Sequence, residues 1–274
     1  MKKLLSLTIL LLALTLCLGL VACSDNNNIT PPHTHEFSDW VSNDNGTKSQ
    51  KCSCGYENLA VNEKVLIVNN GVLKGLTDYG KTLSDIVIPN GVTAIDKDAF
   101  NCCDLLKSIE ISSTVTSIGK FAFYNCKSLV SVSIGNSVES IGDYAFYNCK
   151  MLSSVIIPST VTSLGEYAFA NCNLLSSVTL GEGLTNLSSY LFYNCISLTN
   201  IVIPNTISSI GNSAFAGCEG LKSIILSKNI VKIASSAFAC CDLLTIYCKA
   251  QSKPIGWHTY WNDTNCTVVW GYRE

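Results

Sequence analysis

Four potential metal ligands lie in one short segment near the N-terminus. His33 and His35 form a His-x-His pair, and Cys52 and Cys54 form a Cys-x-Cys pair. An Asn-Gly pair at positions 45–46 predicts a hairpin turn that would bring the two pairs together. Thiolate and imidazole suit tetrahedral zinc, so a structural Cys2His2 zinc site is one interpretation. The Cys-x-Cys spacing is tighter than in common zinc motifs, so a local disulfide or free thiols are the alternatives.

The rest of the chain offers little catalytic chemistry. Only one further histidine occurs, His258, and there is no Gly-x-Ser-x-Gly, His-Glu-x-x-His, phosphate-binding or dinucleotide-binding motif. A Cys/His hydrolase needs an activated thiol beside a histidine, and the repeated cysteines described below have no histidine in their repeats. The sequence therefore predicts that the protein is not an enzyme.

A repeat of 23 residues organises most of the chain, and positions 152–172, LSSVIIPSTVTSLGEYAFANC, represent it. The repeated phenylalanines are Phe100, Phe123, Phe146, Phe169, Phe192, Phe215 and Phe238. The repeated cysteines are Cys103, Cys126, Cys149, Cys172, Cys195, Cys218 and Cys241. A fixed period of this length predicts a solenoid, in which each unit buries its apolar face against its neighbours.

Each repeat predicts two short extended pieces and a turn. Leu-x-x-Ile-x-Ile predicts a strand whose Leu and alternate Ile point inward, and a second short piece follows it. The glycines Gly119, Gly142, Gly165 and Gly211 then turn the chain, and we expect positive φ angles there. Around the Ala-Phe pair we expect one turn of α- or 3-10 helix, with the phenylalanines stacked along the solenoid. The predicted fold class is a repeat solenoid, mainly β with short helical or 3-10 turns, capped at both ends.

The chain has 15 cysteines, and seven of them share one repeat position. Side chains stacked in parallel do not give disulfide geometry, so we expect these cysteines to be reduced and to fill the core as small apolar groups. An extracellular location keeps disulfide formation as an alternative. Outside this column, Cys248 and Cys266 are a candidate disulfide.

The repeat over residues 83–247 resembles the BspA-like subclass of leucine-rich repeats, through its in-register Leu, Ile, Phe and Cys positions. The resemblance implies a leucine-rich-repeat-like fold. It also implies a bacterial surface protein that adheres to host extracellular proteins or to other cells. The resemblance assigns no binding role to any individual residue.

The N-terminal segment predicts export. Two lysines and an apolar run predict a signal peptide over residues 1–22. The run ends in Leu-Val-Ala-Cys at positions 20–23, which resembles the lipobox of bacterial lipoproteins. The resemblance implies cleavage before Cys23, a lipid on its sulfur and an extracytoplasmic, lipid-anchored location, with residues 23–32 as lipidated cysteine and tether. An uncleaved transmembrane anchor is the alternative.

Three further segments flank the repeats. Residues 33–58 form the small His/Cys module, and residues 59–82 are expected to form a hairpin cap that turns at an Asn-Gly pair. Residues 248–274 are expected to form a C-terminal cap rich in aromatic residues, including Trp257 and Trp261. Such caps cover the open ends of a solenoid. Stacking of a sugar on the cap tryptophans is the alternative role.

Tyrosines beside the repeated Phe are the first candidate binding residues: Tyr144, Tyr167 and Tyr190 two positions before it, and Tyr124, Tyr147 and Tyr193 one position after it. Tyrosine is favoured in binding surfaces, although these rings could instead stack on one another and shield the turn. The second candidate is the outward row of the first predicted strand: Val87, Glu110, Ser133, Ile156, Thr179, Val202 and Ile225.

Charge excludes one class of partner. Only 14% of residues are charged and Arg273 is the only arginine, which argues against nucleic-acid binding. The sequence therefore predicts a cell-surface lipoprotein whose solenoid binds another macromolecule, most readily a protein of the host or of a bacterial surface. The alternatives are an envelope-spacing protein without a specific ligand and a glycan-binding surface protein.

Overall fold

The computed structural model describes residues 39, 41–43, 47–51, 57–61 and 63–273. The chain divides into two units, Met1–Val41 with Ser49–Asn58, and Ser42–Lys48 with Leu59–Glu274. Near the N-terminus, β1 (Val41–Ser42), β2 (Thr47–Lys51) and β3 (Glu57–Val61) form a sheet in the order β1-β2-β3. The solenoid lies in the second unit.

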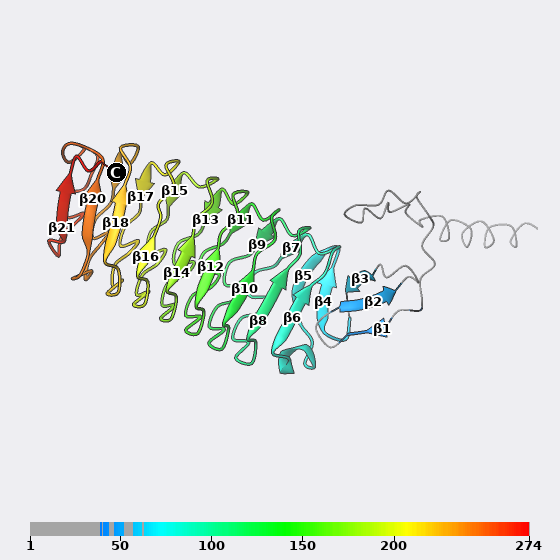
Figure 1. Ribbon diagram of the computed structural model, residues 1–274. Coiled ribbons are helices and arrows are strands. Elements are labelled where there is room, and N and C mark those ends of the chain that lie inside the picture. The colour runs from blue at the N-terminus through cyan, green and yellow to red at the C-terminus, as the bar shows by residue number, and fades with distance from the viewer. Residues whose placement is uncertain (1–38, 40, 44–46, 52–56, 62, 274) are drawn as a thin grey trace, which may run out of the picture. The chain divides into compact units, whose positions relative to one another are not determined.

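The solenoid is a stack of coils in which successive strands lie side by side in chain order (Figure 1). The first strand row consists of β6 (Asp85–Ile88), β8 (Ser108–Ile111), β10 (Ser131–Ser133), β12 (Ser154–Ile156), β14 (Ser177–Thr179), β16 (Asn200–Ile201), β18 (Ser223–Leu226), β20 (Thr245–Cys248) and β21 (Thr267–Trp270). The second strand row consists of β7 (Ala94–Ile95), β9 (Ser117–Ile118), β11 (Ser140–Ile141), β13 (Ser163–Leu164), β15 (Asn186–Leu187), β17 (Ser209–Ile210) and β19 (Lys232–Ile233). This architecture confirms the predicted β-rich repeat solenoid.

Strands pair in parallel with residues one repeat away, as in Ser108 with Ser131 and Val155 with Val178. The first row forms the sheets β10-β8-β6 and β12-β14-β16-β18-β20-β21. The second row forms β13-β11-β9-β7-β5-β4 and β15-β17-β19. Alternation along each strand buries one face, so that Ile109 and Ile111 are each 2% exposed while Glu110 points to solvent.

The hairpin β4 (Leu66–Asn69) and β5 (Val72–Leu76) begins the solenoid. Asn70 and Gly71 turn it with φ angles of 49° and 74°, and β5 then pairs in parallel with β7. This arrangement follows from the Asn-Gly pair, because two consecutive positive φ angles match the twist of a two-residue hairpin.

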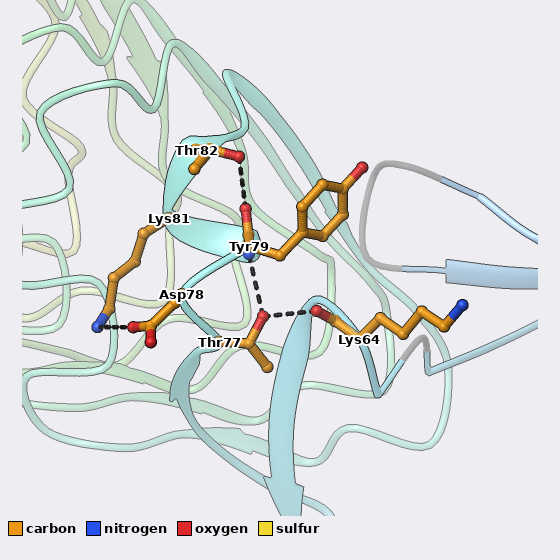
Figure 2. A network of polar contacts seen from close by, with 7 residues as sticks. Lys64, Thr77, Asp78, Tyr79, Lys81 and Thr82 are labelled. Atoms are coloured by element: carbon orange, nitrogen blue, oxygen red, sulfur yellow. Dashed lines mark hydrogen bonds and ion pairs between the residues drawn. The ribbon is translucent and has the colours of Figure 1, made fainter.

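A short 3-10 turn, η1 (Gly80–Thr82), connects the hairpin to the first coil (Figure 2). The Thr77 hydroxyl donates to the carbonyl of Lys64 at 2.5 Å and accepts the N–H of Gly80 at 3.0 Å. A side chain on Gly80 would place its Cβ 2.4 Å from the carbonyl of Val65, so the close approach requires glycine. The Thr77 contacts therefore fix the entry of the chain into the stack.

The segment around each Ala-Phe pair forms turns rather than the expected helical turn. In the coils around Phe100 to Phe215, three N–H groups instead donate to carbonyls of the next coil. In one pair of coils the bonds run from Tyr144 to Glu166 (2.9 Å), from Phe146 to Ala168 (2.8 Å) and from Asn148 to Ala170 (2.8 Å). The peptide group that accepts also donates onward, as from Tyr167 to Ser189 at 3.2 Å. Three chains of hydrogen-bonded peptides therefore run along the stack, and they use the N–H groups that a helix would need.

The expected positive φ angles at the repeat glycines were wrong. Gly119, Gly142, Gly165 and Gly211 are absent from the described residues with positive φ, which instead include the tyrosine and asparagine positions of the turn. The glycines allow close approach: a Cβ on Gly165 would lie 2.2 Å from the backbone nitrogen of Asp143 in the preceding coil.

Gly165→Ala is therefore expected to push two coils apart and to lower the free energy of unfolding by about 2–3 kcal/mol, as overpacking does. Urea denaturation followed by circular dichroism measures this change. Ser188→Ala is the matched control, because Ser188 occupies the same repeat position and already carries a Cβ. It loses only the hydrogen bond from its hydroxyl to the carbonyl of Leu164, or about 1 kcal/mol. Equal losses in the two variants would contradict the close-approach explanation.

The core contains two parallel columns. The repeated phenylalanines are fully buried, and their neighbouring ring centroids are 4.8 to 5.9 Å apart, from Phe100 to Phe238. Beside them, each buried column thiol donates to the carbonyl of a phenylalanine 26 residues earlier, as from Cys172 to Phe146 at 3.2 Å. The predicted aromatic stack is confirmed. The thiol is a second donor to its phenylalanine carbonyl, which also accepts a backbone N–H three residues on, as from Cys149 to Phe146 at 3.4 Å.

The C-terminal segment continues both columns. The Trp261 ring meets Phe238 edge to face at 6.1 Å, and Cys266 Sγ lies 3.8 Å from the Phe238 carbonyl. Trp257 Nε1 donates to the carbonyl of Ile230 at 3.0 Å. Cys248 and Cys266 are both free thiols, so the candidate disulfide between them does not form.

Candidate functional site

Several predicted site residues lie outside the described residues: Cys23, the proposed lipid attachment site, and the potential metal ligands His33, His35, Cys52 and Cys54. Within the part of the chain that the structure describes, no group of three or more His, Cys, Asp or Glu side chains could hold a metal ion. The same part contains no helix with the length and apolarity to cross a bilayer. The zinc site and the lipid anchor stay predictions.

The structure brings three of the candidate tyrosines into one column, the tyrosine ladder, formed by Tyr144, Tyr167 and Tyr190. All three have positive φ angles of 55° to 57°. Ring centroids are 4.7 Å apart between Tyr144 and Tyr167 and 4.3 Å apart between Tyr167 and Tyr190, with planes within 7° of parallel. The one-repeat register between coils sets this spacing, since each ring stands directly above the next.

Groups at both ends complete the ladder. Phe121 stacks on Tyr144 at 5.1 Å, and Lys120 Nζ lies 5.1 Å from the Phe121 centroid. At the other end, Asn212 Nδ2 donates to the Tyr190 hydroxyl at 2.9 Å. Sequence reasoning missed these contributions of Phe121, Lys120 and Asn212. The available signal was their place in the repeat, in or directly before the tyrosine column.

Tyr144 and Tyr167 offer ring edges and hydroxyl groups to solvent, because stacked neighbours cover both of their ring faces. Burial and the neighbouring Tyr190 and Tyr144 raise the pKa of Tyr167 to about 12. At physiological pH its hydroxyl is a protonated donor, as it is in any tyrosine. Such a strip suits hydrogen bonding and edge contacts rather than stacking on a flat ligand.

The other tyrosine column is interrupted. Tyr124 and Tyr147 stack at 5.1 Å, but the next repeat carries the fully buried Ala170 at this position. Tyr193 therefore has no ring of its own column below it and meets Tyr190 edge to face at 5.8 Å. The six candidate tyrosines are all half-buried and divide into one continuous ladder and one broken column.

The outward-facing side chains of the first strand row differ in how exposed they are. Val202 is 76% exposed, Ile156 68% and Ile225 37%, whereas Val87 is half-buried. Glu110, Ser133 and Thr179 are exposed polar members of the same row. The apolar members therefore lie mainly in the C-terminal half, where the second candidate surface is concentrated.

The cap tryptophans do not form a sugar-stacking platform. Trp257 is 3% exposed and Trp261 is 6% exposed, and their rings pack edge to face with centroids 4.6 Å apart. Both rings belong to the core of the cap, so sugar stacking on Trp257 and Trp261 is excluded.

The fold and its stacked columns define a leucine-rich repeat solenoid. A crystal structure of a leucine-rich repeat protein from Bacteroides ovatus is 26% identical, with a TM-score of 0.45, and the match covers 77% of this chain and 71% of that chain. The T. pallidum leucine rich repeat protein is 26% identical, with a TM-score of 0.44 and coverage of 55% and 82%. The pneumococcal vaccine antigen PcpA is 21% identical, with a TM-score of 0.52, and the match covers 77% of this chain and 47% of that chain. The likeness to PcpA shows the fold alone.

A family model for the BspA type leucine rich repeat region matches residues 77–195 and 139–267, with six copies of the repeat. The chain therefore belongs to the BspA type leucine-rich repeat family. Proteins of this type are typically bacterial surface proteins, and leucine-rich repeats generally mediate protein interactions. No curated protein sequence matches the chain.

Proposed function

We propose that this chain is a lipid-anchored bacterial surface protein that adheres to a partner protein through the tyrosine ladder. The observation that supports this proposal most directly is the ordered strip of tyrosine rings on a stack of hydrogen-bonded coils. The ring centroids are 4.7 Å apart between Tyr144 and Tyr167 and 4.3 Å apart between Tyr167 and Tyr190. Family membership and the lipobox at positions 20–23 support the surface location. Cys23 would carry the lipid, and residues 23–32 would form the tether.

A rigid aromatic strip binds with little loss of side-chain entropy. Tyrosine combines a large contact area with few rotatable bonds, and here the stacked neighbours already fix each ring. Because both ring faces of Tyr144 and Tyr167 are covered, these two rings give a glycan no face on which to stack. A protein partner can use the hydroxyls and ring edges, so a protein is the favoured ligand class.

The test compares Tyr144→Phe with Tyr167→Phe as a double variant against Tyr260→Phe. The double variant keeps the stacked rings and removes two hydroxyl groups, whereas Tyr260 is exposed and outside the ladder. Binding of the full-length protein is measured on a panel of extracellular-matrix proteins and on partner cells. We expect the double variant to weaken saturable binding by about tenfold through two lost hydrogen bonds, with an unchanged melting temperature. The control is expected to bind like the wild type.

Two results would count against the proposal. Absence of saturable binding by the wild type would favour an envelope-spacing role. Unchanged binding by the double variant, together with a lower melting temperature for Tyr144→Ala and Tyr167→Ala, would show that the ladder only packs the turn. Mutual stacking of the rings is the observation that favours this second reading.

A further inference from the structure

A groove of about 430 Å³ follows the second strand row along β15, β17 and β19. Asn186, Ser209 and Lys232 share one register position of these strands, and all three line the groove with polar side chains. Ser188 and Gly211 directly follow β15 and β17, and because both residues are small they leave space beside the two strands. Because β15 and β17 lie side by side in the stack (Figure 1), the groove crosses consecutive coils.

Two opposite charges line this groove, the carboxylate of Glu166 and the ammonium group of Lys232. Glu166 lies in the coil of Phe169, and Lys232 lies in the coil of Phe238, three repeats further on. Since neighbouring coils are about 4.8 Å apart, these two coils are about 14 Å apart along the stack. Both charged residues are exposed, and neither forms an ion pair with another of the described residues. Each charge is therefore available to a ligand.

The two charges that directly precede Glu166 in its column neutralise each other. Lys120 and Asp143 occupy the same repeat position as Glu166, and their side chains form an ion pair at 3.3 Å. The other Asp143 oxygen accepts the N–H of Glu166 at 3.0 Å. In the next two repeats this position carries the uncharged Ser189 and Asn212, so the column offers no cation to the Glu166 carboxylate.

Uncharged polar groups line the groove between these two charges. They include the amide of Asn186 and the hydroxyls of Ser189 and Ser209. None of the described residues that line the groove is aromatic, so it has no face on which a sugar ring could stack. Amide and hydroxyl groups can hydrogen-bond to the backbone of an extended peptide, which rises about 3.3 Å per residue. A span of about 14 Å therefore corresponds to about four peptide residues.

We infer that this groove binds an extended segment of the partner protein that carries a lysine or arginine about four residues from an aspartate or glutamate. The basic side chain pairs with Glu166, and the acidic side chain pairs with Lys232. The groove adjoins the tyrosine ladder through Asn212, which lines the groove and donates to the Tyr190 hydroxyl at 2.9 Å. This inference rests on the proposed function, in which the solenoid binds a protein, and it adds the charge pattern of that partner.

The test selects a random peptide phage library on the immobilised full-length protein and measures the enriched peptides, with blocked termini, by fluorescence polarisation. We expect enriched peptides to carry a basic and an acidic residue about four positions apart. Glu166→Gln and Lys232→Gln are each expected to weaken the binding of these peptides about three- to fivefold, because each variant loses one exposed charge pair. Selection on Lys232→Glu is expected to enrich a second basic residue in place of the acid.

Glu110→Gln and Lys228→Gln are the matched controls, because both residues are exposed charges that do not line the groove. Each control is expected to leave the peptide affinity as in the wild type. The inference is overturned by enriched peptides without the charged pair, by wild-type affinity in both groove variants, or by equal losses in the controls.

Failure of this inference can be distinguished from failure of the proposed function. If the Tyr144→Phe and Tyr167→Phe double variant loses binding to matrix proteins while Glu166→Gln and Lys232→Gln bind both these proteins and the peptides normally, the ladder assignment holds and the groove assignment is wrong. If the peptides show the charged pair and depend on Glu166 and Lys232 while the tyrosine variant binds matrix proteins normally, the groove assignment holds and the ladder assignment is wrong.

Discussion

Raising the pH from 8 to 11 is expected to unfold the solenoid. Burial raises the pKa of the column thiols above their ordinary value near 9, to about 12 for Cys172 and Cys241 and in the same direction for Cys126, Cys149, Cys195 and Cys218. Above pH 9 the unfolded chain therefore releases protons that the folded chain retains. The folded state binds more protons, so the free energy of unfolding falls as the pH rises.

The size of this effect follows from the number of thiols. Each thiol that ionises only in the unfolded chain lowers the free energy of unfolding by about 1.4 kcal/mol per pH unit. The six fully buried column thiols alone give roughly 8 kcal/mol per pH unit, against a total stability of about 5–15 kcal/mol for a typical domain. Burial also raises the pKa of the Cys103, Cys248 and Cys266 thiols, which act in the same direction. The midpoint of alkaline unfolding is therefore expected about one to two pH units above 9. The raised pKa of Tyr167 acts in the same direction between about pH 10 and 12.

Urea denaturation at pH 8, 9 and 10 under reducing conditions measures how steeply the free energy of unfolding falls with pH. Cys172→Ala combined with Cys195→Ala removes two of the nine thiols whose pKa is raised by burial, and is expected to reduce the thiol contribution to this slope by about a fifth. This comparison separates the thiols from lysine and tyrosine titration, which the variant retains. A slope that is the same in wild type and variant, or a stability that does not change between pH 8 and 10, would contradict the protonated thiol column.

Phe169→Ala is expected to lower the free energy of unfolding by about 3–5 kcal/mol. The Phe169 side chain is fully buried and stacks on Phe146 at 5.1 Å and on Phe192 at 5.9 Å. A solenoid is stabilised by contacts between neighbouring coils, so this one truncation weakens two such interfaces and leaves a cavity between them. Urea denaturation at pH 7 followed by circular dichroism measures the change.

Two further variants set limits on the expected loss of stability. Phe169→Leu keeps an apolar side chain in the column and is expected to lose about 1.5 kcal/mol. Ile156→Ala, whose side chain is 68% exposed, is expected to change stability by less than about 0.5 kcal/mol. A loss below about 1 kcal/mol for Phe169→Ala would show that the phenylalanine stack does not hold the coils together.

Predictions from local sequence were wrong where the backbone of one coil hydrogen-bonds to or packs against the backbone of the next coil. The expected helical turn around Ala-Phe does not form, because the N–H groups of Phe146 and Asn148 donate to the next coil at 2.8 Å. Likewise, Gly165 was expected to supply a positive φ angle, but it is needed for the approach to Asp143. Each contact joins residues about one repeat apart in the sequence, and no local propensity describes it.

Surface chemistry also depended on the stacked arrangement. Tyr144, Tyr167 and Tyr190 were identified from their repeat position, but only the structure shows that their faces cover one another. Trp257 and Trp261 illustrate the reverse case, because an aromatic cluster in the sequence carries no information on whether its rings face the core or the solvent.

The sequence by itself determined the solenoid, its register and the columns of Phe and Cys, because a constant period places equivalent residues above one another whatever the detailed backbone path. The tertiary structure alone decided which turn geometry joins the strands and which aromatic faces are covered. These features depend on distances between neighbouring coils of a few ångströms, and such distances are set by hydrogen bonds and packing across the stack rather than by the order of residues within one repeat.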